Sequence, residues 1–163
     1  MNIKDTGIRY MVTILVLIVI IGLGYASLTG KTHDKKILKE QTRYTQALQF
    51  LQNQEYDQAV TLLKLVKEDY PNSATVKYYL GTSLANIREW NSAAQEYQQI
   101  LDLNPYKVKE PIFMIQFAGI LINAKKLDEA KIVLEKCLTL PIPEQIPNYL
   151  EQVNSLIDQI STK

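Results

Sequence analysis

The stretch EYDQAVTLLKLVKEDYPNS, residues 55–73, decides the fold because the chain repeats its pattern 34 residues further on. The second copy reads EWNSAAQEYQQILDLNPYK and occupies residues 89–107. A glutamate, an aromatic residue, an alanine and a proline stand at corresponding positions in the two copies. A fixed period of this length is typical of repeat architectures in which each unit adds one layer.

Each copy is predicted to belong to a pair of helices joined by a turn. Apolar side chains in residues 37–51 recur at spacings of three, four and seven, which places them on one face of a helix. The pattern breaks at NQEYD and then resumes. Pro71 disfavours a helical conformation at the residue before it, and Asn72 or Ser73 can cap the next helix. The predicted unit is therefore a helix–turn–helix of about 34 residues.

A third pair of helices follows, with small residues at the same places. The small positions of the three pairs are Ala47 and Ala59, Gly81 and Ala93, and Ala118 and Ala130. Small side chains let two helices approach to within about 8–10 Å, so we expect each pair to cross at these residues. Three extra residues fall in the turn NPYKVKEP, whose Pro111 is predicted to begin the next helix. A last helix at about 147–161 is predicted to cover the exposed end of the stack.

This pattern resembles the tetratricopeptide repeat family over roughly residues 38–140. The matching residues are Ala47, Tyr56, Ala59 and Pro71 in the first unit, Leu80, Gly81, Trp90, Ala93, Tyr97 and Pro105 in the second, and Ala118, Leu127 and Ala130 in the third. The resemblance implies an all-α fold, a three-repeat solenoid with a C-terminal capping helix. The implied domain covers 37–163, with repeats at about 38–72, 73–106 and 108–142.

The amino-terminal part of the chain has a different composition. Residues 10–30 read YMVTILVLIVIIGLGYASLTG and carry no charge. About 20 helical residues span the ~30 Å core of a bilayer, so this segment is predicted to be a transmembrane helix. It would lie between a basic leader at 1–9 and a linker at 31–36. A cleaved signal peptide is the alternative, because Gly24-Tyr25-Ala26 has the small-residue spacing of a cleavage site.

The predicted localisation is therefore the cell membrane, with a single span. Counting Lys and Arg near the two ends of the segment mildly favours the cytoplasmic side for the repeat domain, by a margin that the free amino terminus narrows. A short basic leader before a first span slightly favours the repeat domain on the exported side, and the cytoplasmic side remains the alternative.

Composition gives no sign of catalytic or nucleic-acid chemistry. Lys and Arg number 18 and Asp and Glu 17, so the net charge of +1 offers no general attraction to nucleic acid. One cysteine and one histidine do not make a Cys-His metal cluster. Cys137 falls on an apolar helical stripe and is predicted to be a core residue. We therefore expect no catalytic residue, no metal site, no cofactor and no small-molecule substrate.

The resemblance also implies a concave groove lined by the first helix of each repeat, which binds an extended or helical peptide. The corresponding positions are Gln41, Tyr44, Leu48, Gln52, Thr75, Tyr78, Thr82, Asn86, Ile112, Ile115 and Asn123. They include none of the Lys and Arg residues with which a subset of the family grips the C-terminal carboxylate of chaperones. Aromatic, apolar and amide side chains favour an amphipathic helix or an apolar strand instead. Inward packing of Tyr78, Ile112 and Ile115 is the alternative.

The sequence as a whole predicts a membrane-anchored scaffold or adaptor. It would bind a membrane-associated protein partner in the groove, for complex assembly or quality control. The alternative is a structural subunit of a larger membrane complex, held through the transmembrane helix and the convex face.

Overall fold

The computed structural model describes residues 18–19, 39 and 41–161. The chain divides into two compact units, 1–42 and 43–163, and the fold below is that of the second. The predicted leader, linker and membrane segment lie outside the described residues, except for the helical Ile18 and Val19.

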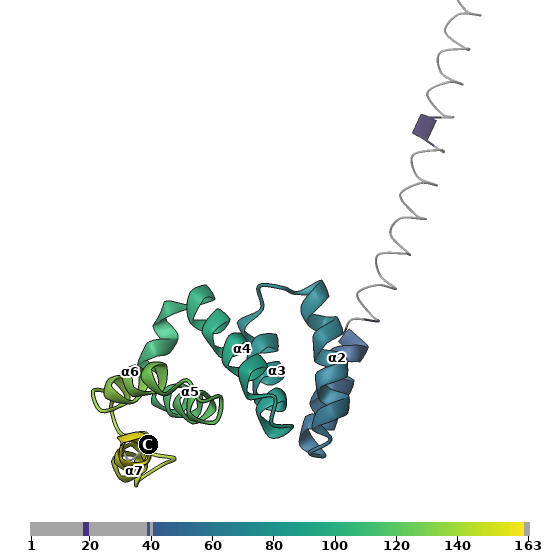
Figure 1. The fold of residues 1–163 in the computed structure, drawn as a ribbon. Coiled ribbons are helices and arrows are strands. Elements are labelled where there is room, and N and C mark those ends of the chain that lie inside the picture. The colour runs from purple at the N-terminus through teal and green to yellow at the C-terminus, as the bar shows by residue number, and fades with distance from the viewer. Residues whose placement is uncertain (1–17, 20–38, 40, 162–163) are drawn as a thin grey trace, which may run out of the picture. The chain divides into compact units, whose positions relative to one another are not determined.

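The described part of the second unit is made of helices, and it contains no β-strand. Residues 43–52 are helical and are followed by six α-helices and one 3-10 helix. These are α2 (Tyr56–Asp69), α3 (Ala74–Asn86), α4 (Trp90–Leu103), η1 (Pro105–Lys109), α5 (Pro111–Asn123), α6 (Leu127–Cys137) and α7 (Tyr149–Ser161). From α2 onward each α-helix packs against the next along the chain (Figure 1). The predicted all-α solenoid is confirmed, whereas the exact repeat bounds stay a prediction.

The turn within each pair of helices has the same backbone conformation. Gln54, Arg88 and Lys125 stand at φ values of 61°, 65° and 63°. A left-handed residue ends a helix because it lets the following amide reach back to an unpaired carbonyl. The corresponding hydrogen bonds run from Glu55 N to Phe50 O, from Glu89 N to Leu84 O and from Lys126 N to Leu121 O, at 2.8, 2.9 and 3.0 Å. The repeat is therefore present in the backbone as well as in the side chains.

The links between pairs begin the next helix with a polar cap or a proline. Ser73 Oγ accepts a hydrogen bond from Val76 N at 3.3 Å and caps α3. Asn104 Oδ1 accepts one from Tyr106 N at 3.2 Å, and η1 follows in the turn where the sequence has its extra residues. Pro111 begins α5, as the sequence predicts.

Small residues occupy the helix crossings. The alanines at the predicted positions, Ala47, Ala59, Ala93, Ala118 and Ala130, are each 0% exposed. Gly81 is also buried. A Cβ at Gly81 would meet the Tyr97 ring at 2.8 Å and Glu96 Cβ at 3.2 Å, so its closest contacts are these side chains and not the predicted Ala93.

Replacing Gly81 with alanine is therefore expected to lower the free energy of unfolding by about 1–3 kcal/mol, because the added methyl group overpacks the site. Gly119→Ala is the matched control on α5. Its Cβ meets no neighbouring side chain within 4 Å, and alanine stabilises a helix interior by roughly 0.5–1 kcal/mol relative to glycine. Urea denaturation of the two variants measures both effects. Equal stability of Gly81→Ala and wild type would contradict the close approach of α3 and α4.

The predicted single-pass membrane localisation is corrected by the structure. Within the described residues, no helix is long and apolar enough to cross a membrane. The longest of the bounded helices, α2 and α4, have 14 residues each. At about 1.5 Å per residue they rise roughly 21 Å, less than the ~30 Å of a bilayer core. Neither single-pass localisation nor a membrane-associated partner has support in the structure.

Candidate functional site

The groove positions predicted from the sequence lie on three helical segments. On residues 43–52, Tyr44 and Leu48 are half-buried and Gln52 is exposed. On α3 and α5, Thr75, Asn86 and Asn123 are exposed, Tyr78, Thr82 and Ile112 are half-buried, and Ile115 is 9% exposed. Gln41 is exposed and belongs to the first unit, so it is not placed relative to the others.

A hydrogen-bond network brings the central predicted residues together. Tyr78 Oη donates to Gln116 Oε1 at 3.1 Å, and Tyr97 Oη donates to the same oxygen at 3.3 Å. Thr82 Oγ1 lies 3.1 Å from Tyr97 Oη. The network therefore joins α3, α4 and α5 through Gln116. Sequence reasoning missed Gln116, because its phenol partners lie 38 and 19 residues away in the chain.

Aromatic rings form the base of this network. The Tyr97 ring stacks on Phe113 and Phe117, with centroids 5.0 and 5.8 Å apart, and lies 5.9 Å from Tyr78. Burial raises the pKa of the Tyr97 phenol far above its ordinary value, although its hydrogen bond to Thr82 opposes the rise. The phenol therefore stays protonated and remains a hydrogen-bond donor. The base of the site is aromatic and uncharged.

Two exposed amides flank the network at equivalent positions of two repeats. Asn86 Nδ2 donates to Thr82 O at 2.9 Å, and Asn123 Nδ2 donates to Gly119 O at 2.8 Å. Each contact uses one amide hydrogen and orients the side chain along its own helix. Each amide keeps a second N–H and its carbonyl oxygen for other contacts. We call the surface that carries these amides the α3–α5 face, comprising Thr75, Tyr78, Thr82, Asn86, Ile112, Ile115, Gln116 and Asn123.

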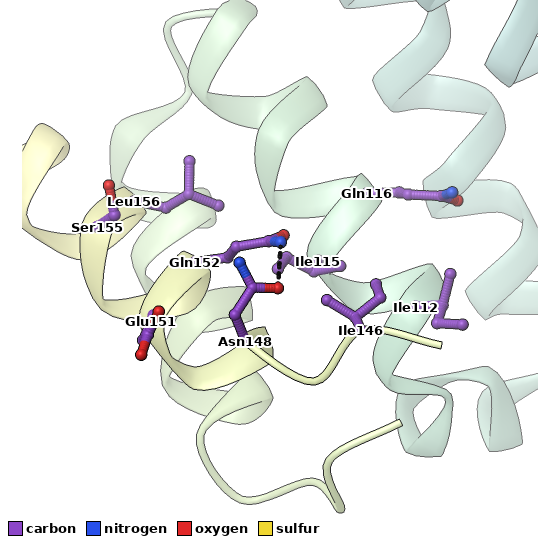
Figure 2. Close-up of a pocket in the computed structure, with 9 residues that line it drawn as sticks. All are labelled: Ile112, Ile115, Gln116, Ile146, Asn148, Glu151, Gln152, Ser155 and Leu156. Carbon is purple, nitrogen blue, oxygen red and sulfur yellow. Dashed lines mark hydrogen bonds between the residues drawn. The ribbon is translucent and has the colours of Figure 1, made fainter. Parts of the chain in front are cut away.

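A cleft of about 580 Å³ adjoins this face, between α5, the loop before α7 and α7 itself (Figure 2). Its apolar lining is Ile112, Ile115, Ile146 and Leu156. Its polar lining is Gln116, Asn148, Glu151, Gln152 and Ser155. Sequence reasoning found only the two α5 isoleucines, because it treated α7 solely as a cap. The amphipathic pattern of α7 could have suggested more, since only its Tyr149 and Val153 are buried.

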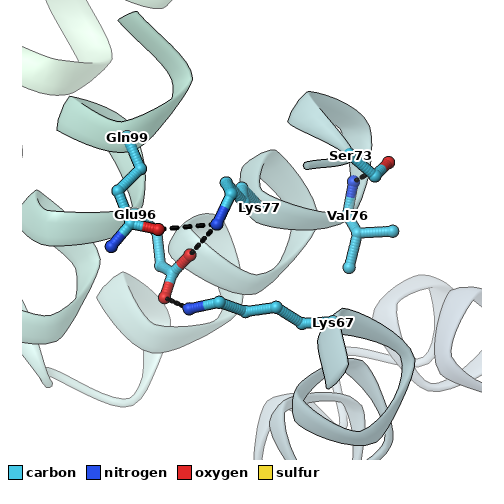
Figure 3. Close-up of polar contacts among 6 residues, drawn as sticks. All are labelled: Lys67, Ser73, Val76, Lys77, Glu96 and Gln99. Atoms are coloured by element: carbon cyan, nitrogen blue, oxygen red, sulfur yellow. Dashed lines mark hydrogen bonds and ion pairs between the residues drawn. The ribbon is translucent and has the colours of Figure 1, made fainter. Parts of the chain in front are cut away.

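A buried ionic cluster lies apart from the cleft and joins α2, α3 and α4 (Figure 3). Glu96 Oε1 pairs with Lys67 Nζ, and Glu96 Oε2 lies 4.0 Å from Lys77 Nζ. Lys77 Nζ also donates to Gln99 Oε1 at 2.6 Å. Burial lowers the pKa of Lys77, as does the charge of Lys67, while Glu96 acts in the opposite direction. The cluster therefore links the side chains of three helices where they pack together.

Metal-binding and nucleophilic chemistry have no evident site in the described residues. No group of three or more His, Cys, Asp or Glu side chains there could hold a metal ion. Cys137 is fully buried, and burial raises the pKa of its thiol. A protonated and inaccessible thiol is a poor nucleophile, so Cys137 is a core residue.

The comparisons with known proteins agree with this architecture. Residues 41–73 match the family model described as tetratricopeptide repeat. No curated protein sequence matches the chain. The fold is that of a helical-repeat protein, and the matched segment covers the helical residues 41–52 and all of α2. Residues 41–73 therefore resemble a tetratricopeptide repeat, and over this segment the resemblance predicted from the sequence is confirmed.

Solved structures extend the likeness to most of the chain. The Yersinia enterocolitica type III secretion chaperone SycD, in complex with a peptide of the translocator YopD, has a TM-score of 0.61 at 19% identity, over 75% of this chain and 92% of that one. The first TPR of Spaghetti (RPAP3), bound to the HSP90 peptide SRMEEVD, gives 0.59 at 18% identity, over 76% and 91%. The TPR2B domain of yeast Sti1, in a complex with Hsp70, gives 0.60 at 14% identity, over 77% and 98%. At these identities the likeness shows the fold.

Proposed function

We propose that this chain is a non-enzymatic adaptor that binds a peptide segment of a protein partner on the α3–α5 face. The observation that carries the proposal is the cleft beside α5, which has an apolar floor and a mainly neutral polar rim. Its volume of about 580 Å³ falls within the ~300–1,000 Å³ usual for ligand pockets. Structures of similar fold that hold peptides support the same function.

The proposed binding uses two kinds of contact. Apolar side chains of the partner enter the cleft, while the exposed amides of Asn86 and Asn123 pair with its backbone. An amide both donates and accepts, so it suits a peptide backbone whatever the sequence. The Tyr78–Gln116–Tyr97 network holds α3 and α5 in register, so little ordering is needed when the partner binds.

The test is the Asn86→Ala/Asn123→Ala double variant of the full-length chain. Peptides are first selected from a random display library on the wild-type chain, and their Kd values are measured by fluorescence polarisation. Loss of two hydrogen bonds of about 0.5–1.5 kcal/mol each is expected to weaken binding roughly tenfold or more. Both side chains are exposed, so the unfolding transition should change little.

Asn72→Ala/Asn91→Ala is the matched control, because it removes two exposed amides elsewhere on the chain. The control should bind the selected peptides as wild type does. Unchanged affinity of the Asn86→Ala/Asn123→Ala variant would contradict binding on the α3–α5 face.

A further inference from the structure

The elements that surround the cleft carry charge of only one sign. α5 contains no charged side chain, and the charged residues between 138 and 161 are Glu144, Glu151 and Asp158. Glu151 lines the cleft directly and is exposed. None of the nine lining residues is Lys, Arg or His. A carboxylate of a bound partner would therefore meet only like charge, whereas a cation would meet opposite charge.

The cations of η1, which packs against α5, do not change this balance. Lys107 pairs with Glu110 at 2.7 Å, and Lys109 lies over the Tyr106 ring at 5.3 Å. Both cations are engaged within their own segment, next to the first turn of α5. Among the elements that line the cleft, the charged side chains of α7 and the preceding loop are all carboxylates.

The inner part of the cleft is suited to an apolar peptide. Isoleucine side chains come from α5 and from the loop at Ile146, and Leu156 adds a third surface from α7. Leu156 packs against the core but stays half-buried, so part of its side chain remains open to a ligand. Burial of apolar surface stabilises a complex by roughly 25 cal/mol per Å² before the costs of association.

An amide pair faces the isoleucines across the cleft (Figure 2). Gln152 Nε2 donates to Asn148 Oδ1 at 3.0 Å. This contact leaves Gln152 Oε1 as an acceptor and Asn148 Nδ2 as a donor. Together they match the N–H and C=O groups of one peptide unit.

We propose that this cleft binds an apolar segment of a protein partner that is flanked by basic residues, and that Glu151 selects for that positive charge. The inference rests on the proposed function and specifies its ligand. It separates this chain from its structural neighbour RPAP3, whose bound peptide SRMEEVD ends in Glu-Glu-Val-Asp.

The experiment begins with the library selection on the full-length chain. We expect the enriched peptides to combine Leu, Ile, Val, Met or Phe with Lys or Arg, and to be poor in Asp and Glu. Glu151→Lys is expected to weaken their binding roughly three- to tenfold, as is usual for reversing one charge at an exposed rim. Glu144→Lys changes the carboxylate of the loop before α7 and is expected to weaken binding of the same peptides. Glu135→Lys, exposed on α6 and outside the cleft, is the matched control and should leave binding unchanged.

The outcomes separate the charge preference from the proposed function. Enriched acidic peptides, or equal binding by Glu151→Lys and wild type, would overturn the charge preference and leave peptide binding standing. A failure to enrich any peptide would overturn both. Self-association of the wild-type chain that Glu151→Lys abolishes would assign the cleft to a second copy and overturn the proposed partner. Thermal unfolding of each variant establishes that it is folded.

Discussion

Replacing Tyr97 with alanine is expected to lower the free energy of unfolding by about 3–5 kcal/mol, the usual cost of truncating a large buried aromatic residue. The Tyr97 side chain is among the largest that are fully buried, and it packs over Gly81 and against Phe113 and Phe117. Because Gly81 has no side chain, the part of the cavity directly beside it would stay unfilled. The substitution also removes a hydrogen-bond partner from Thr82 and from Gln116.

Two further substitutions separate the parts of the Tyr97 effect. Tyr97→Phe keeps the ring and loses only the hydroxyl, so it should cost about 1 kcal/mol. Tyr106→Ala removes a tyrosine that is 74% exposed and should change stability by less than about 0.5 kcal/mol. Guanidinium denaturation followed by circular dichroism measures all three. A Tyr97→Ala variant no less stable than Tyr97→Phe would contradict the packing described here.

Replacing Glu96 with alanine is expected to destabilise the fold by about 3 kcal/mol, because removal of one partner leaves a buried charge without compensation. Lys77 is 5% exposed and would keep only Gln99 as a polar partner. Lys67 is more exposed, so water can solvate part of its charge. The same guanidinium denaturation measures the loss.

The control for Glu96 is the exposed ion pair between Lys107 and Glu110. Glu110→Ala should cost at most about 1 kcal/mol, because exposed pairs contribute little. Combining Glu96→Leu with Lys77→Met should recover much of the loss, since apolar residues can replace a buried ion pair at little cost. If Glu96→Ala and Glu110→Ala have equal effects, the buried cluster contributes no more than a surface pair.

The helical pairs could be predicted from the sequence because their signals are local. Alanines at helix crossings and prolines after helices lie within one or two turns of the structure that they determine. The period of 34 then repeats these local signals along the chain. Ala59 and Ala93 illustrate this, because each stands near the start of the second helix of its pair and both are fully buried. Pro111 likewise acts on its own helix, since its fixed φ suits the first turn of α5.

The polar contacts of the candidate site could not be predicted, because they depend on distances between repeats. In the sequence, nothing distinguishes Gln116 from other exposed helical glutamines. Its hydrogen bonds to Tyr78 and Tyr97 form only when α3, α4 and α5 pack together. Asn148 and Gln152 could not be assigned to the cleft from the sequence, because they line it only when α7 packs beside α5. The closest neighbour of Gly81 was misassigned for a related reason, since period alone does not say which side chain of α4 reaches it.

The packing of each helix against its neighbours in the chain bears on how the protein is made. Most contacts join helices that are consecutive in the chain, from α2 with α3 to α6 with α7. Such short-range contacts form quickly, because little chain entropy is lost in closing the loops between them. Synthesis delivers about 5–20 residues per second, and helical hairpins form far faster. Each pair of helices therefore has time to fold before the next pair has left the ribosome. The pairs already folded then offer the emerging helix an apolar surface to pack against.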